Sequence, residues 1–187
     1  MLHYSTDVPL SIKSIIYIPS THNERQGLMQ ESSDMHLYSR KVLIKEKCSE
    51  LLPFYLRFVK GVVDCEDLPL NISRENYQDS GLITKLRNVL TRRVIKLIDD
   101  EAKRDPESYK RWYSDFGQFI KEGIAVDSDN KDALFRLIRV NSKSGGQKKL
   151  ISLDDYIDNM KEGQEKIYFL VNPQFDLALK SPYMEPF

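Results

Sequence analysis

The chain has 187 residues, and its 28 lysines and arginines equal its 28 aspartates and glutamates, so the formal net charge is zero. A chain of this length can form one large domain with a hydrophobic core, and 41% hydrophobic residues with only 8 glycines and 8 prolines exclude disorder throughout. Apolar runs stay well below the roughly 18 residues that a membrane-spanning helix needs, and the balanced charge gives no overall reason to expect nucleic acid as a partner.

The first third of the chain has the alternating apolar pattern that is typical of β-strands. Residues 10–18 and 37–44 predict two strands, and residues 58–63 predict a third that ends in an acidic turn. Between the first two strands, residues 19–34 are polar and have no period. We therefore expect a mobile loop there.

The middle of the chain changes to a helical period. Residues 82–98 place apolar side chains at helical spacing and predict a long amphipathic helix. Pro106 suits the first turn of a second helix, which has an aromatic inner face and is expected to end at Gly123. A third helix is expected over about 130–140, and residues 141–149 are expected to form a loop.

The last part of the chain predicts a short helix over 152–160. It opens with a capping box, in which Ser152 is the cap and Asp155 takes the place of the usual glutamate. Residues 167–171 then predict an apolar strand, and a further helix is expected from residue 173 onward. Because this strand and helix begin a unit that nothing completes, we expect the chain to be a piece of a longer protein.

The cysteines and histidines predict neither disulfides nor a metal site. Cys48 and Cys65 have no CxxC spacing, which favours a reduced compartment, and the start of the chain lacks the features of a secretory signal. The three histidines form no HxH or HExxH pattern, and the acidic turn Asp64, Glu66 and Asp67 lacks the spacing of a calcium-binding loop. We expect a solvated turn there and no bound metal.

A possible anion site lies just after the third predicted strand. Asn71 is a good helix N-cap, and Arg74 and Gln78 follow it at positions that share one helical face. A guanidinium beside unpaired helix amides favours phosphate oxygens. The alternative from the residues alone is an ordinary cap with a surface arginine that pairs with Glu75 or Asp79.

The sequence over 58–75 resembles the signature of the middle domain of the heat-shock protein 90 chaperones. Further similarity covers 37–44, the helix from Gln78, 167–170 and 181–183, so that it spans essentially the whole chain. Within that family the chain looks most like the mitochondrial, tumour-necrosis-factor-receptor-associated branch. Cys65 stands where the family usually has serine, which suggests an added redox sensitivity.

This resemblance implies an α/β fold of the α+β sandwich type. The expected architecture is a three-layer αβα middle domain similar to the second domains of gyrase B and MutL, with a small helical coil and the start of a second α/β unit after it. The implied boundaries are 1–104 for the sandwich with its catalytic loop, 105–163 for the helical connector and 164–187 for the truncated second unit. The family's preceding helix would be missing.

The resemblance also implies a mechanism. In the full-length chaperone the catalytic loop would present Arg74 to the γ-phosphate of ATP, while Asn71 and Gln78 support that loop and complete the cofactor-binding set. ATP and Mg²⁺ would bind in the absent N-terminal domain, which also supplies the catalytic base. We therefore expect that this chain alone binds no cofactor and hydrolyses no ATP.

The implied partners are the N-terminal nucleotide-binding domain of the same chain and client proteins. Leu28 and Met29 in the polar loop are candidates for client contact, and the parent is expected to be a homodimer in the mitochondrial matrix, with the cytoplasm as the alternative compartment. No membrane partner is expected. Two competing hypotheses are an inert structural connector and a nucleic-acid-binding module. The second would use the basic helix face formed by Lys85, Arg87, Arg92, Arg93 and Lys96.

Overall fold

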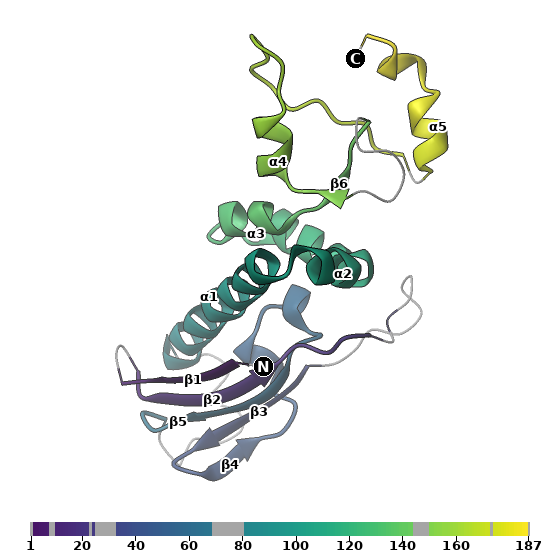
Figure 1. Ribbon diagram of the computed structural model, residues 1–187. Helices are drawn as coiled ribbons and strands as arrows, with labels where there is room; N and C mark the ends of the chain where they lie inside the picture. Colours follow the sequence, from purple (N-terminus) through teal and green to yellow (C-terminus); the bar gives the residue numbers. More distant parts are fainter. Residues whose placement is uncertain are drawn as a thin grey trace.

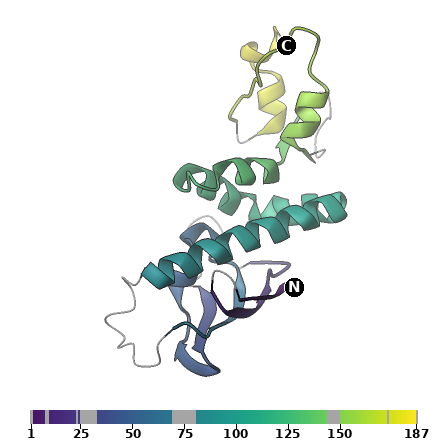
Figure 2. The ribbon, with the colours of Figure 1, turned by 90° about the vertical axis from the view of Figure 1, so that its left-hand side faces the viewer.

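The computed structural model describes residues 2–7, 10–22, 24, 33–68, 81–143, 150–172 and 174–186. A β-sheet lies at one end of the molecule beside the N-terminus, helices follow it in the middle, and the C-terminal elements extend to the opposite end (Figures 1 and 2). None of the helices in these ranges is long and apolar enough to cross a bilayer.

The sheet has five strands in the order β1-β2-β5-β3-β4. Among the strands that the structure describes in this sheet, only the pairing of β3 with β5 is parallel, and the other neighbours are antiparallel. Side chains alternate between a buried and an exposed face, as in β2, where Ile12 and Ile16 point into the core. The strands are β1 (Leu2–Thr6), β2 (Ile12–Tyr17), β3 (Asp34–Ser39), β4 (Val42–Lys45) and β5 (Lys60–Cys65).

The sequence pattern did not reveal two features of this sheet. Strand β1 was not predicted, and the single strand expected over 37–44 is a hairpin of β3 and β4. Arg40 and Lys41 form its turn with φ values of 49° and 67°, a conformation that usually requires glycine or asparagine. The Lys41 amide donates a hydrogen bond to the Asp64 carboxylate at 3.0 Å, which helps to stabilise this turn.

Gly61 explains why β2 and β5 can pair so closely. Its φ is 153°, and a Cβ atom at this position would lie 2.3 Å from the carbonyl oxygen of Ile15. Any larger residue would push the two strands apart.

Helices cover one face of the sheet. Helix α1 (Gly81–Arg104) passes across it, and α2 (Pro106–Val126) and α3 (Lys131–Leu137) pack beside α1 (Figures 1 and 2). Two short 3₁₀ segments, η1 (Ser49–Leu51) and η2 (Phe54–Leu56), contact α1 and α2 respectively. One continuous core joins the sheet to these helices.

The predicted start of α2 is confirmed, but its predicted end is wrong. Pro106 occupies the first turn, and the Asp105 side chain accepts a hydrogen bond from the Ser108 amide at 2.9 Å. The helix continues past Gly123 to Val126. The missing side chain of Gly123 instead makes room for the buried ring of Tyr55.

The C-terminal part contains short elements. Strands β6 (Val140–Asn141) and β7 (Leu150–Ile151) pair with each other, and α5 (Phe175–Leu179) and η3 (Pro182–Met184) follow later. Helix α4 (Leu153–Asp158) has the predicted capping box, with hydrogen bonds of 2.9 and 3.0 Å between Ser152 and Asp155.

The strand expected over 167–171 is wrong. In the described residues this segment has no regular secondary structure, and no neighbouring strand pairs with it. Its apolar side chains are exposed, with Phe169 and Val171 both at 85%. An apolar run becomes a strand only where a partner supplies the ladder of backbone hydrogen bonds.

Candidate functional site

The residues predicted to contact phosphate, Asn71, Arg74 and Gln78, lie outside the described residues. The same holds for Leu28 and Met29, the candidates for client contact. The structure does describe the residues on both sides of the segment 69–80, up to Leu68 and from Gly81 onward.

The upstream flank is bonded to the sheet by its backbone. The Ser39 hydroxyl on β3 donates a hydrogen bond to the Leu68 carbonyl at 2.6 Å, and the Leu68 side chain is buried. On the other side, the Asp67 carboxylate accepts from the Ser11 amide at 2.7 Å, and the Glu66 amide donates to the Ser11 carbonyl at 3.1 Å. The chain therefore leaves β5 at a fixed position.

The acidic turn has a structural role in this flank. Glu66 and Lys13 form an ion pair at 2.7 Å, and their mutual hydrogen bond lowers the pKa of Glu66 and raises that of Lys13. The sequence suggested a solvated turn, but the structure shows that Asp64, Glu66 and Asp67 each accept a hydrogen bond from another segment. Within the described residues, no three side chains of ligand type gather to hold a metal ion.

The downstream flank is the start of α1. Ile83, Leu86 and Leu90 are buried in the core, so the first turns of the helix are packed on the protein. Both ends of the segment that carries Arg74 therefore join rigid elements.

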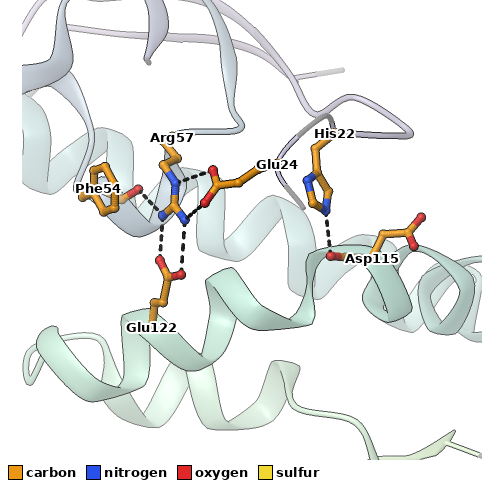
Figure 3. A network of polar contacts seen from close by, with 6 residues as sticks. All are labelled: His22, Glu24, Phe54, Arg57, Asp115 and Glu122. Carbon is orange, nitrogen blue, oxygen red and sulfur yellow. Dashed lines mark hydrogen bonds and ion pairs between the residues drawn. The ribbon is translucent and has the colours of Figure 1, made fainter. Parts of the chain in front are cut away.

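A second polar centre was missed by the sequence reasoning. The Arg57 side chain is 3% exposed and lies between the carboxylates of Glu24 and Glu122, each of which accepts two hydrogen bonds from it (Figure 3). The guanidinium also lies over the rings of Phe54 and Phe119, at 4.1 and 4.5 Å from their centroids. Burial acts to lower the pKa of Arg57, but the hydrogen bonds with both carboxylates raise it overall, so the group stays charged.

The same region corrects the expectation of a mobile loop over 19–34, as far as that loop is described. His22 donates a hydrogen bond from Nε2 to the Asp115 carbonyl at 2.8 Å (Figure 3). Its ring also packs edge-on against Phe116 and Phe119. Glu24 is 6% exposed. His22 therefore joins the start of the loop to α2, and Glu24 joins it to Arg57. Sequence spacing could not show this, because the partners are 93 and 33 positions apart.

Cys65 is unsuited to the redox role suggested by the sequence. Its side chain is fully buried in the core, and burial raises the pKa of its thiol. Thiolate formation and access to oxidants are both reduced in such an environment.

The basic face of α1 is partly neutralised within the chain. Lys96 forms an ion pair with Asp100 at 2.9 Å, and the Arg93 guanidinium lies over the ring of Tyr4, 4.4 Å from its centroid. Lys85, Arg87 and Arg92 are exposed. The face therefore offers phosphates fewer free cations than its sequence suggested.

Comparison with known proteins decides the family. Residues 1–187 match the family model described as Hsp90 protein. The chain belongs to the Hsp90 family. Its mixed α/β structure, with a five-stranded sheet and long helices, agrees with a segment of the Hsp90 middle domain.

Similar Hsp90 proteins come from mitochondria and from bacteria. The chain is 48% identical over 189 residues to TNF receptor-associated protein 1 homolog, mitochondrial, of Dictyostelium discoideum, with 100% of the chain and 27% of that protein covered. It is 46% identical to Heat shock protein 75 kDa, mitochondrial, of Bos taurus over 98% of the chain and 27% of that protein. It is 44% identical to Chaperone protein HtpG of Desulfitobacterium hafniense over 100% of the chain and 30% of that protein. The chain thus spans less than a third of the length of these Hsp90 relatives.

Proposed function

We propose that the chain is the middle-domain module of an ATP-dependent chaperone and that it supplies Arg74 to the γ-phosphate of ATP. The observation that carries this proposal is the match of the whole chain to the Hsp90 family, together with the presence of Asn71, Arg74 and Gln78 in one segment. The fixed flanks of that segment support the proposal, because a catalytic side chain must be held in position by rigid neighbours.

The chemical role of Arg74 follows from its charge. A guanidinium beside the transferring phosphoryl group neutralises the charge that builds up there, and Asn71 and Gln78 stabilise the segment around it. A nucleotide with Mg²⁺, bound in a nucleotide-binding domain of the same full-length protein, would supply the leaving group and part of the charge neutralisation. The chain alone is then inactive.

We further propose three units, 1–104, 105–163 and 164–187, with a third layer on the sheet. The sheet face opposite α1 carries Ile15 and Tyr17, which are 47% and 45% exposed. A helix from another part of the full-length protein would bury this face and complete an αβα sandwich of the type found in gyrase B and MutL. The exposed residues 167–171 would similarly pair with strands from the remainder of the third unit.

The partners follow from the same proposal. Clients would be unfolded proteins, with Leu28 and Met29 in the contact region, and the full-length protein would form a homodimer. Mitochondrial relatives at 46 and 48% identity favour the mitochondrial matrix as the location of the full-length protein. A bacterial relative is 44% identical, so proteins of similar sequence also occur outside mitochondria.

The test is ATP turnover by the full-length protein with Arg74→Ala. We expect a loss on the order of a thousandfold, as for other arginines that contact a transferring phosphoryl group. Arg92→Ala is the matched control, since Arg92 is an exposed arginine of α1. Unchanged turnover in Arg74→Ala, or turnover by the isolated 187-residue chain, would contradict the proposal.

A further inference from the structure

Strand β4 forms a free edge of the sheet. Among the described strands it pairs with β3 alone, and it is the outermost strand in Figure 1. We propose that this edge binds an extended acidic segment of a client polypeptide, which pairs with β4 as an additional strand. This inference rests on the proposed chaperone function, because it names a surface and a chemical class for the client that this function requires.

The hairpin turn determines which backbone groups of β4 are left without a partner on β3. Ser39 pairs with Val42 across a turn of two residues, and both turn residues have positive φ. In such a hairpin the residues next to the turn hydrogen-bond with each other, and the following pair, here Tyr38 and Leu43, does not. The amide and the carbonyl of Leu43 therefore point away from β3, toward the free edge. An extended polypeptide backbone supplies a donor and an acceptor at the spacing that these two groups require.

Side chains on both faces of this edge offer apolar contact. Val42 and Leu43 are 52% and 43% exposed, and neighbouring residues of a strand point to opposite faces of a sheet. A partner strand with apolar residues on both of its faces would cover these two side chains. Unfolded polypeptides expose such segments, whereas folded proteins bury most of them.

The charges beside β4 favour an acidic partner. Arg40, Lys41 and Lys47 are exposed, and Glu46 is the exposed acidic residue among them. Lys45 already forms an ion pair within the chain. Pairing of β4 with a second copy of itself would bring the basic residues of both copies together, so charge repulsion opposes it and also opposes a basic client. An acidic segment meets the opposite charge.

The experiment measures peptide binding by the full-length protein with fluorescence anisotropy. The probe is a labelled peptide of alternating valine and glutamate, and a peptide of alternating valine and lysine is the comparison. We expect the acidic peptide to bind more tightly and to slow amide hydrogen exchange of residues 42–45, measured by mass spectrometry, because strand pairing covers the Leu43 amide. Equal affinity for the two peptides, or unchanged exchange of residues 42–45, would overturn the inference.

Leu43→Pro tests the backbone pairing directly. It removes the outward amide without removing a donor from the β3–β4 ladder, and an edge strand tolerates proline at such a position. Leu43→Ala is the matched control, because it also shortens the side chain but keeps the amide. The Kd of the acidic peptide should rise about tenfold in Leu43→Pro and about threefold in Leu43→Ala. Equal Kd values in the two variants would contradict strand pairing.

A pair of charge variants keeps the inference falsifiable if Leu43→Pro fails to fold. Lys41 and Lys47 have φ values of 67° and 48°, a conformation that asparagine tolerates well. Lys41→Asn with Lys47→Asn should therefore keep the fold and weaken binding of the acidic peptide about fivefold. The control removes two exposed lysines from helices, by Lys85→Asn with Lys121→Asn, and should leave this affinity unchanged. Equal effects of the two double variants would show that the charge beside β4 has no specific role.

Slow exchange of residues 42–45 before any peptide is added would show that the edge is already covered, and this would overturn the inference. A second copy is the occupant if the protection rises with protein concentration, and another part of the full-length protein is the occupant if it does not. ATP turnover by Arg74→Ala separates the two proposals. Unchanged turnover in that variant rejects the proposed catalytic role alone, whereas lost turnover without peptide binding at β4 rejects only the inference about the edge.

Discussion

The Glu24 carboxylate accepts two hydrogen bonds from Arg57, at 2.9 Å from Nε and 2.6 Å from a terminal nitrogen. This bidentate pair joins the segment after β2 to Arg57, the residue that follows η2. Arg57 also binds the carboxylate of Glu122, which extends the contact to α2 (Figure 3). The pair therefore connects the sheet layer to the first helix of the proposed connector. The two carboxylates should contribute unequally to stability, because the Glu24 side chain is 6% exposed and the Glu122 side chain is 42% exposed.

Glu24→Gln should destabilise the chain more than Glu122→Gln. Loss of the buried Glu24 charge leaves Arg57 with one carboxylate and should lower the free energy of unfolding by about 2 to 3 kcal/mol. Loss of the half-exposed Glu122 charge should lower it by about 1 kcal/mol or less. Urea denaturation of the two variants measures the difference. Each variant removes one of the two carboxylates that pair with Arg57, so each serves as the control for the other. Equal losses of unfolding free energy would contradict the role of burial.

The helical half of the fold could be predicted because its signals are local. Pro106, the aromatic face of α2 and the Ser152–Asp155 capping box each depend on residues within one or two helical turns. The sheet was harder to predict. The β3–β4 turn at Arg40 and Lys41 has no glycine or asparagine to indicate it, and its conformation depends partly on contact with Asp64.

The candidate site shows the same limit. Asn71, Arg74 and Gln78 were found because they lie close together in sequence, and they remain predictions. The Arg57 centre joins residues separated by 33 and 65 positions, and only one signal pointed to it, an arginine within the apolar stretch 54–59. Ser39 gave no signal at all, since a serine in a strand does not reveal the distant carbonyl to which it bonds.

Gly123→Ala should destabilise the chain. A Cβ at this position would lie 2.8 Å from Cδ2 of Tyr55 and 3.0 Å from a methyl group of Leu134. Tyr55 is buried and donates a 2.7 Å hydrogen bond to Asp127, so its ring cannot move without loss of that bond. The overpacking should outweigh the higher helix propensity of alanine and leave a net loss of about 1 to 2 kcal/mol by thermal or urea denaturation.

Gly81→Ala is the control for this substitution. Gly81 also lies in a helix, but among the described residues no heavy atom beyond its chain neighbours and the backbone of its own helix lies within 4 Å of a Cβ built there. We expect an effect within about 0.5 kcal/mol of zero or a small gain in stability. If both glycine variants changed stability alike, steric crowding by Tyr55 would not be the cause.

Cys65 and Cys48 should react slowly with thiol reagents in the native chain. Both side chains are fully buried, and burial raises the pKa of the Cys65 thiol, so reaction requires transient opening of the core. Titration with an aromatic disulfide should detect two thiols in guanidinium chloride and almost none in buffer over the same time. Rapid native reaction that Cys65→Ser removes would restore the redox hypothesis.

Glu50 should contribute stability at neutral pH that is lost in acid. Partial burial acts to raise the pKa of Glu50, but hydrogen bonds from Lys45 at 2.9 and 3.2 Å, from its own backbone and from Cys48 together lower it to about 2. The folded-state pKa lies below the usual value of about 4.3, so the folded protein favours the ionised carboxylate. The contribution is therefore fully present above about pH 4.5 and disappears as the pH falls toward 2.

Glu50→Gln should therefore lower the free energy of unfolding at pH 7 by about 1 to 3 kcal/mol and reduce the loss of stability between pH 4.5 and 2. Glu107→Gln is the control, since Glu107 pairs with Lys110 at 2.8 Å but is 74% exposed, and it should change stability by less than about 0.5 kcal/mol at either pH. Urea denaturation at pH 7, 4.5 and 3 measures both variants. An acid dependence in Glu50→Gln equal to that of the unmodified chain would show that protonation of Glu50 does not drive the loss, because the variant has no carboxylate at this position to protonate.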